Sequence, residues 1–126
     1  MYKRQVLGSS GGSSLGAVTA LSSDNRIGQI TFAGADGTDI NTHAASIAAY
    51  VDGSVSSNNV PARIVFATGP SETERLRIGS DGKIGINCTP LSQFQVKIGT
   101  NQNIAFNSSS SCLLYTHLTL PTIYSV

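Results

Sequence analysis

The segment from Glu74 to Asn87, ERLRIGSDGKIGIN, most constrains what this chain can fold into. Two short runs that alternate apolar and polar residues, Leu76–Ile78 and Lys83–Ile86, flank the Ser80–Gly82 triplet. An Asp-Gly pair between such runs is a strong hairpin signal, because glycine adopts a positive φ at no steric cost. We therefore predict a chain built of short strands and tight turns.

The composition favours the same fold class. The 126 residues are 12% charged and 40% hydrophobic, so charged residues reach only about half of their usual share. Amphipathic helices need charged and long straight-chain residues on their wet face, whereas serine, threonine, asparagine and glycine dominate here. We predict one all-β unit of short antiparallel hairpins, and fibrous and repetitive β-proteins share this bias in composition.

Charge and cysteine content limit the classes of partner. The net charge is +1 and, apart from Lys3 and Arg4, the basic residues are scattered, so we expect no nucleic-acid binding. No run of about 18 apolar residues occurs, so we expect no membrane insertion, and the N-terminus lacks the apolar core of a signal peptide. Cys88 and Cys112 are too few for a disulfide framework or a zinc site, and we expect two unpaired thiols.

The chain divides into three parts by composition. Residues 1–15 contain the stretch GSSGGSS and are expected to form a flexible N-terminal segment. Residues 16–106 are expected to form the β-rich module. Residues 107–126 are a serine run followed by CLLYTHLTLPTIYSV, which breaks the strand-and-turn rhythm. This tail resembles the translated read-through of a sequencing adapter, so we expect it to be non-native and the chain to be a fragment.

Alternation and β-branched residues predict further strands within residues 16–106. These strands are expected at Gly16–Leu21, Arg26–Phe32, Ala62–Thr68 and Phe94–Ile98, and from Ile104 onward. Turns are expected at residues 34–37 and at Asp52-Gly53.

The alanine-rich segment Asn41–Val51 is ambiguous when it is considered alone. It fits a helix with Thr42 as the N-cap, and it also fits a strand of period two. The neighbouring strands, and the family resemblance described next, favour a strand.

Three of these motifs follow one another in an order that carries a family likeness. They are ITFAGADGTDINTHAASIAAYVDG (Ile30–Gly53), ARIVFATG (Ala62–Gly69) and the Ser-Asp-Gly hairpin with Thr89-Pro90 after it. Together they resemble a module of bacteriophage tail fibres over about residues 26 to 98. Members of that family commonly read GIGT where residues 85–89 of this chain read GINCT, so that Asn-Cys stands in place of the second glycine. The resemblance implies a homotrimeric β-rich shaft or connector of the kind found upstream of an intramolecular chaperone domain, and no chaperone domain is present in this sequence.

The same resemblance implies a structural role in a virion. The chain would project or connect the host-receptor-binding region of a tail fibre, with its own copies, other tail or baseplate proteins and host-surface glycans as partners. We expect no enzymatic activity and no cofactor. The alternatives are a polysaccharide-degrading tail spike, a carbohydrate-binding module, for which Tyr50 is the obvious exposed aromatic, and a bacterial surface adhesin.

A thin hydrophobic core independently favours association between copies. The chain has four phenylalanines, four tyrosines and no tryptophan, and small domains with little apolar area to bury are marginally stable. We expect apolar strand residues to pack between chains, namely Ile64, Phe66, Ile78, Ile84, Ile86, Val96 and Ile98.

Acidic residues are the first candidates for chemistry. A carboxylate pair among Asp24, Asp36, Asp39 and Asp52 would suit glycan hydrolysis. However, Asp36 and Asp52 directly precede glycines, where aspartate is expected for turn formation. The spacing also does not match the twelve-residue calcium loop. We therefore expect turn-forming aspartates and no catalytic or metal site.

His43 and a charged cluster are the remaining candidates. One His43 per chain on a trimer axis would give three metal ligands, but a lone histidine offers no spacing to test, and we expect an ordinary strand residue. His117 belongs to the tail. In an extended strand Arg75 and Arg77 share a face away from Glu74. With Glu72 they form either inter-chain ion pairs or a solvated strand edge, and we expect the solvated edge.

Overall fold

The protein is an all-β chain, as predicted. A computed structural model describes residues 5–106 and 115–116, in which no helix occurs. The strands are β1 (Arg26–Gly34), β2 (Thr42–Val51), β3 (Ala62–Thr68), β4 (Thr73–Ile78), β5 (Ile84–Ile86), β6 (Phe94–Gly99), β7 (Gln102–Phe106) and β8 (Tyr115–Thr116). Cys112 and His117 lie outside the described residues.

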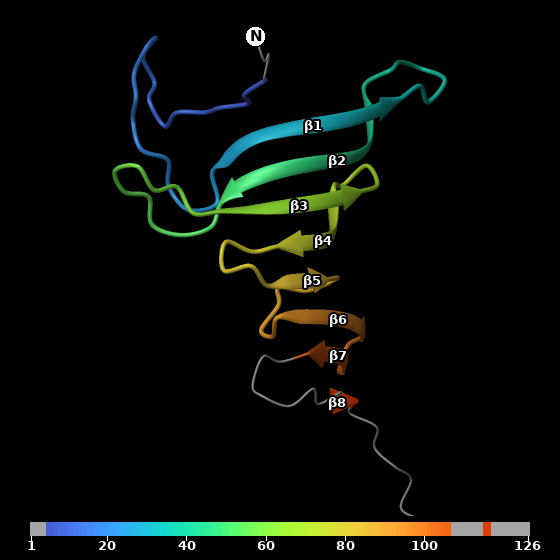
Figure 1. The fold of residues 1–126 in the computed structure, drawn as a ribbon. Coiled ribbons are helices and arrows are strands. Elements are labelled where there is room, and N and C mark those ends of the chain that lie inside the picture. Colours follow the sequence, from blue (N-terminus) through green and yellow to red (C-terminus); the bar gives the residue numbers. More distant parts are fainter. Residues whose placement is uncertain (1–4, 107–114, 117–126) are drawn as a thin grey trace, which may run out of the picture.

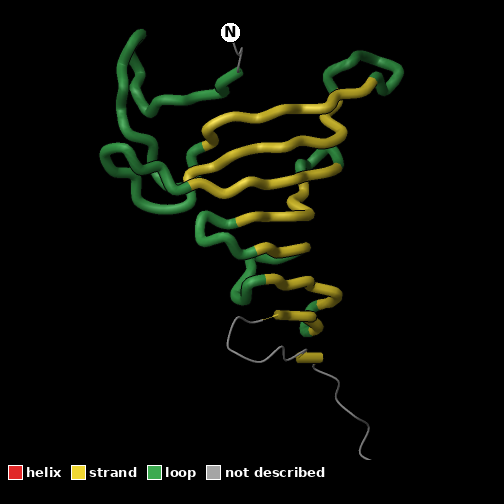
Figure 2. The backbone as a smooth tube through the Cα atoms, viewed as in Figure 1, coloured by secondary structure: helices red, strands yellow, loops and turns green. Residues whose placement is uncertain are grey.

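All of these strands belong to one sheet whose spatial order follows the chain from β1 to β8. Figure 1 shows the sheet tapering from the long strands β1 to β3 toward its C-terminal end. Because the described strands form one sheet and no helix accompanies them, no second layer from these residues covers either face. The long loops lie at the strand ends (Figure 2).

Strand β5 pairs with β6 in parallel, while the other pairs are antiparallel. The expectation of antiparallel hairpins throughout is therefore wrong at this one pair. The connection of residues 87–93 returns the chain to the start of β5 before β6 begins. These seven residues are enough to run back along β5, because a strand of three residues is only about 10 Å long.

The predicted hairpin is confirmed at β4 and β5. Gly82 adopts a φ of 79°, and the Gly79 N–H donates to the Lys83 carbonyl at 2.9 Å. Asp81 forms an ion pair with Lys83 at 2.8 Å and accepts its backbone N–H at 3.1 Å. Both contacts hold the pKa of Asp81 below its ordinary value. Aspartate and glycine thus act as turn residues here.

Two other local predictions are wrong. Gly16–Leu21 forms no strand; instead the Ser10 hydroxyl accepts the Thr19 N–H at 3.0 Å and donates to the Ala17 carbonyl at 2.8 Å. Asp52-Gly53 does not close a tight hairpin, because residues 52–61 form a long loop between β2 and β3. The ambiguous segment Asn41–Val51 is a strand, as favoured.

Gly85 allows the connection between β5 and β6 to pack closely against β5. It is buried, and a Cβ atom there would stand 2.3 Å from the Cys88 carbonyl oxygen and 2.8 Å from Pro90 Cδ. Neither neighbour is a flexible side-chain end, so the backbone would have to move. Glycine is required here by space, since its φ lies outside the left-handed region.

We therefore expect Gly85→Ala to destabilise the protein by about 1–3 kcal/mol, the usual cost of overpacking. Thermal unfolding at fixed protein concentration measures the loss. Gly34→Ala is the matched control, because a Cβ atom at Gly34 meets nothing within 4 Å. Equal midpoints for the two variants would contradict the packing argument.

Candidate interaction surface

A ladder of apolar residues runs the length of the sheet. Cross-strand partners share a face, and successive partners from β1 to β7 are Ile30, Ile47, Phe66, Leu76, Ile86, Val96 and Ile104. Strands in a sheet lie about 4.8 Å apart, so this central ladder is about 29 Å tall. The alternation in the sequence is therefore brought into one continuous apolar stripe.

A second ladder lies beside the first on the same face, since its members stand two residues away along the strands. Its partners from β1 to β7 are Gly28, Ala49, Ile64, Ile78, Ile84, Phe94 and Phe106. The Phe94 and Phe106 rings close it with their centroids 5.7 Å apart. On the other side of the central ladder, Phe32 pairs with Ala45 at the N-terminal end of the sheet.

These two ladders and Phe32 are called the apolar face below. Neither ladder contains a charged residue. Ile30 and Phe32 are 52% and 53% exposed, and Ile64 is 43% exposed. Ile98, which was expected to join this set, lies at a register shift in β6 and outside the paired ladders. Contiguous apolar patches of this extent are uncommon on single soluble chains and usually mark an interaction site.

The opposite face is covered by the sheet's own polar side chains. Ser46, Ala48, Val65 and Ala67 are 4–7% exposed and lie on this polar face. Here Arg77 pairs with Val65 and Glu74 with Ala67 in the register of β3 and β4. Small residues beneath long polar ones are thus buried without a second layer.

The Arg77 and Glu74 side chains form a bidentate ion pair on this face. Arg77 Nε and Nη2 donate to the two Glu74 carboxylate oxygens, each at 2.8 Å. The prediction that Arg77 shares a face with Arg75 is wrong, because a β-bulge leaves Arg75 without a partner in β3 and brings Glu74 to Arg77. Arg75 instead donates to Thr68 Oγ1 at 3.0 Å. The hydrogen bonds to Glu74 raise the pKa of Arg77.

Glu72 joins the first two strands from the turn between β3 and β4. Its Oε1 atom accepts the Gln29 amide at 2.6 Å and lies 3.2 Å from His43 Nδ1. His43 is therefore placed beside a carboxylate. Within residues 5–106, no group of three or more histidine, cysteine, aspartate or glutamate side chains could hold a metal ion.

Arg63 ties together two segments that are distant in sequence. Its guanidinium donates to Asp24 Oδ1 at 2.7 Å, to Asp52 Oδ1 at 3.1 Å and to the Val51 carbonyl at 3.1 Å. It also stacks over Tyr50, 5.1 Å from the ring centroid. Sequence reasoning missed this residue, since nothing near it in the chain indicates an acidic partner. Its Nε atom is buried and finds no hydrogen-bond partner among the residues that the structure describes.

Asp52 is a bridge as well as a partner of Arg63. Its Oδ2 atom accepts the Ser80 N–H at 2.9 Å, which joins the β2–β3 loop to the β4–β5 turn. Burial alone would raise the pKa of Asp52, but the Ser80 hydrogen bonds and the Arg63 guanidinium outweigh it, and the pKa lies below its ordinary value.

The remaining acidic candidates organise the β1–β2 loop. Asp36 accepts the Thr42 hydroxyl at 2.7 Å and the N–H groups of Thr38 and Asp39 at 2.8 and 3.1 Å. These hydrogen bonds, that of Thr42 first, lower the pKa of Asp36 to about 2. The turn interpretation of Asp36 is confirmed, and the local contacts of Asp39 are of the same kind, with its Oδ1 accepting the Asn41 N–H.

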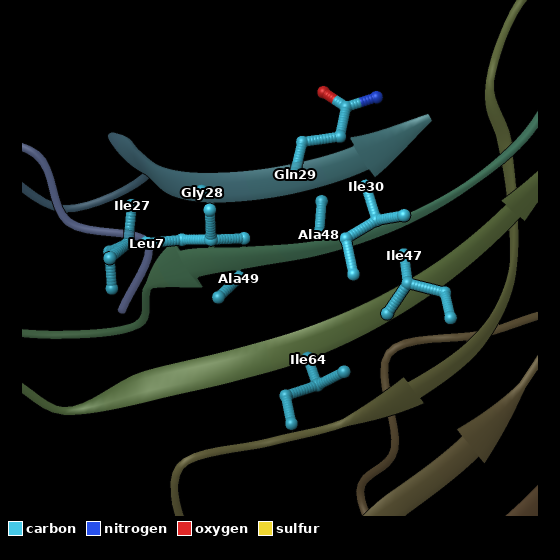
Figure 3. A pocket seen from close by; sticks show the side chains of 9 residues that line it. All are labelled: Leu7, Ile27, Gly28, Gln29, Ile30, Ile47, Ala48, Ala49 and Ile64. Carbon is cyan, nitrogen blue, oxygen red and sulfur yellow. The ribbon is translucent and has the colours of Figure 1, made fainter. Parts of the chain in front are cut away.

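A hollow of about 170 Å³ opens on the apolar face beside Gly28. The residues that line it are Leu7, Ile27, Gly28, Gln29, Ile30, Ile47, Ala48, Ala49 and Ile64, as Figure 3 shows. Gly28 and Ala49 are the small members of the second ladder, so the hollow forms where their side chains leave space between larger neighbours. Leu7 lies against Gly28, where a Cβ atom would stand 2.8 Å from Leu7 Cβ.

No protein-family model and no curated protein matches the chain. Among the described residues there is also no helix with the length and apolar character needed to cross a membrane.

The Asp52 bridge predicts a pH-dependent stability. We expect Asp52→Asn to cost about 1–2 kcal/mol at neutral pH, because charged hydrogen bonds to Arg63 and Ser80 are weakened. A lowered pKa stabilises the fold above the unfolded-state value of about 3.9, and this contribution is lost as the pH falls through the folded-state value. Denaturant titrations should therefore show the variant and the wild type converging in acid.

Asp39→Asn is the control at neutral pH. Its Oδ1 atom accepts only the neighbouring Asn41 N–H, and an asparagine retains that acceptor. A difference between Asp52→Asn and wild type that stayed constant from neutral to strongly acidic pH would contradict the role given to the carboxylate.

Proposed function

We propose that this chain is a structural module of an oligomeric fibre, in which the apolar face packs against other copies of the chain. The observation that carries the proposal is the contrast between the two faces. The polar face is sealed by its own Arg77–Glu74 and Gln29–Glu72 contacts, while Ile30, Phe32 and Ile64 remain about half exposed. Residues of that kind become stable only when another apolar surface covers them.

The proposed assembly is a homotrimer within a bacteriophage tail fibre. The likeness of residues 26–98 to tail-fibre modules supports this assignment. The order of the strands supports it too, because a sheet in which each strand pairs with the next carries the chain steadily from one end to the other, as a shaft or connector requires. Three apolar faces turned toward one axis would give each copy the covering layer that it lacks.

In that role the chain projects or connects the receptor-binding region of the fibre in the virion. Other tail or baseplate proteins hold one end, and host-surface glycans are the target at the other. Three linked copies raise the apparent affinity for repeated host glycans without tight binding at any single site. The function is therefore mechanical and multivalent.

The contacts of the candidate polar residues favour this role over glycan hydrolysis or glycan binding. The Asp36 carboxylate accepts three hydrogen bonds within its own loop, and Asp52 is shared between Arg63 and Ser80. The Tyr50 ring lies under the Arg63 guanidinium. These groups stabilise the sheet and leave the apolar face as its distinctive surface.

We expect the 126-residue wild-type chain to sediment as a trimer and Ile30→Asp to abolish that species. A carboxylate buried in the central ladder without a partner costs at least about 3 kcal/mol. Because a single copy buries few side chains, the variant should also lose much of its β-signal in circular dichroism. Sedimentation velocity and circular dichroism on the same samples measure both effects.

Ile40→Asp is the matched control. Ile40 is 70% exposed and lies in the β1–β2 loop, outside the two ladders, so the trimer should persist. A folded, monodisperse wild-type monomer would refute the proposed function.

A further inference from the structure

The hollow beside Gly28 and the Phe32 ring stand at opposite ends of strand β1 on the same face. Gly28 belongs to the second ladder, whereas Phe32 lies on the other side of the central ladder. Phe32 is 53% exposed, and the hollow is lined by residues of β1, β2 and β3, aliphatic except for Gly28 and Gln29, and by Leu7 from the N-terminal segment (Figure 3). One copy therefore carries both an exposed ring on β1 and an apolar hollow that begins on the same strand.

The hollow has the size that an aromatic ring needs. A cavity of roughly 150 Å³ lined by aliphatic and aromatic side chains can hold a benzene molecule, and this hollow measures about 170 Å³. Ile30, Ile47, Ala49 and Ile64 offer only carbon surface to such a ring. Phe32 supplies a ring, and no charged residue stands in the two ladders between it and the hollow.

Within one chain Phe32 stands next to Ile30 at the wall of this hollow and does not lie over its floor at Gly28 and Ala49. The cross-strand partner of Ala49 is Gly28, four residues before Phe32 on β1, and four residues of an extended strand span about 13 Å. Around an axis parallel to the ladders, however, the Phe32 side of one sheet meets the Gly28 side of the next at the same level. A heterologous contact of this kind gives a closed ring when the rotation between copies closes, as it does for a trimer with a three-fold axis.

We propose that the Phe32 ring of each copy inserts into the hollow formed by Ile30, Ile47, Ala49 and Ile64 of the neighbouring copy. This inference rests on the proposed trimer and names the contact that sets its order and register. The occupant is a second copy of this chain, because the ladders continue the apolar surface from the hollow on β1–β3 to β7, for about 19 Å beyond the hollow. A face of that extent suits an interface of standard size rather than a small ligand.

Covalent trapping tests the contact in the 126-residue chain. In the double variant Phe32→Cys/Ala49→Cys, the two thiols of one chain are too far apart to join, since a disulfide needs Cα atoms within about 7 Å. Mild oxidation, in which copper phenanthroline and dissolved oxygen accept the two electrons and two protons of each thiol pair, should link neighbouring copies. Non-reducing gels should then show covalent dimers and closed trimers, which reductant returns to single chains.

The controls separate this contact from random collisions and from the native thiols. Ile40→Cys/Ala49→Cys has its first thiol on the exposed loop, and each single variant has only one new thiol beside Cys88 and Cys112. All of these should stay monomeric on the gel. In addition, Phe32→Ala should weaken trimer association about tenfold or more, as loss of a buried aromatic anchor does, whereas Ile40→Ala should not.

The outcomes distinguish this inference from the proposed function. A trimer in sedimentation without cross-links in the double variant would overturn the Phe32 contact and leave the fibre proposal standing. That result would follow if Leu7 of the same chain filled the hollow. A folded monomer would overturn both, and cross-links confined to the double variant would support both.

Discussion

The structure depends on one constraint, which is that a single sheet has two faces and this chain covers only one of them. The register places fourteen partners in two ladders on the apolar face. Nothing in the described residues forms a layer above them. Apolar side chains left in water contribute no stability, so a second apolar surface laid on this face would add the favourable free energy of burial that the isolated sheet lacks.

The polar face shows how the chain holds its own geometry without a conventional core. Small residues such as Ala48 and Val65 lie below ion pairs and amide contacts made by longer side chains. Arg63 and Asp52 then tie the strands to the loops at one edge. The polar face sets the shape of the sheet, and this leaves the apolar face free to serve association, which is the basis of the proposed fibre module.

Much of the fold follows from local signals in the sequence. Alternation in Ala62–Thr68 and the Asp-Gly turn before Lys83 predict their strands, because side-chain period and turn chemistry act over a few residues. The bulge at Arg75 was not predictable, since it depends on how β4 aligns with β3. The Arg63 partners were missed for the same reason, because Asp24 is brought close only where the segment before β1 pairs with Val51 at the end of β2. The parallel pair escaped prediction because turn residues show where a strand ends and not which way the chain returns.

The sequence by itself determined the all-β class, most strand positions and the presence of alternating apolar residues with too little bulk for a self-sufficient interior. These properties depend on neighbours along the chain. Only the tertiary structure decided that alternating residues from seven strands align into two continuous ladders, and that Gly28 and Ala49 leave a hollow that begins on the same strand as Phe32. Both depend on inter-strand register, which is set by hydrogen bonding between segments far apart in the chain.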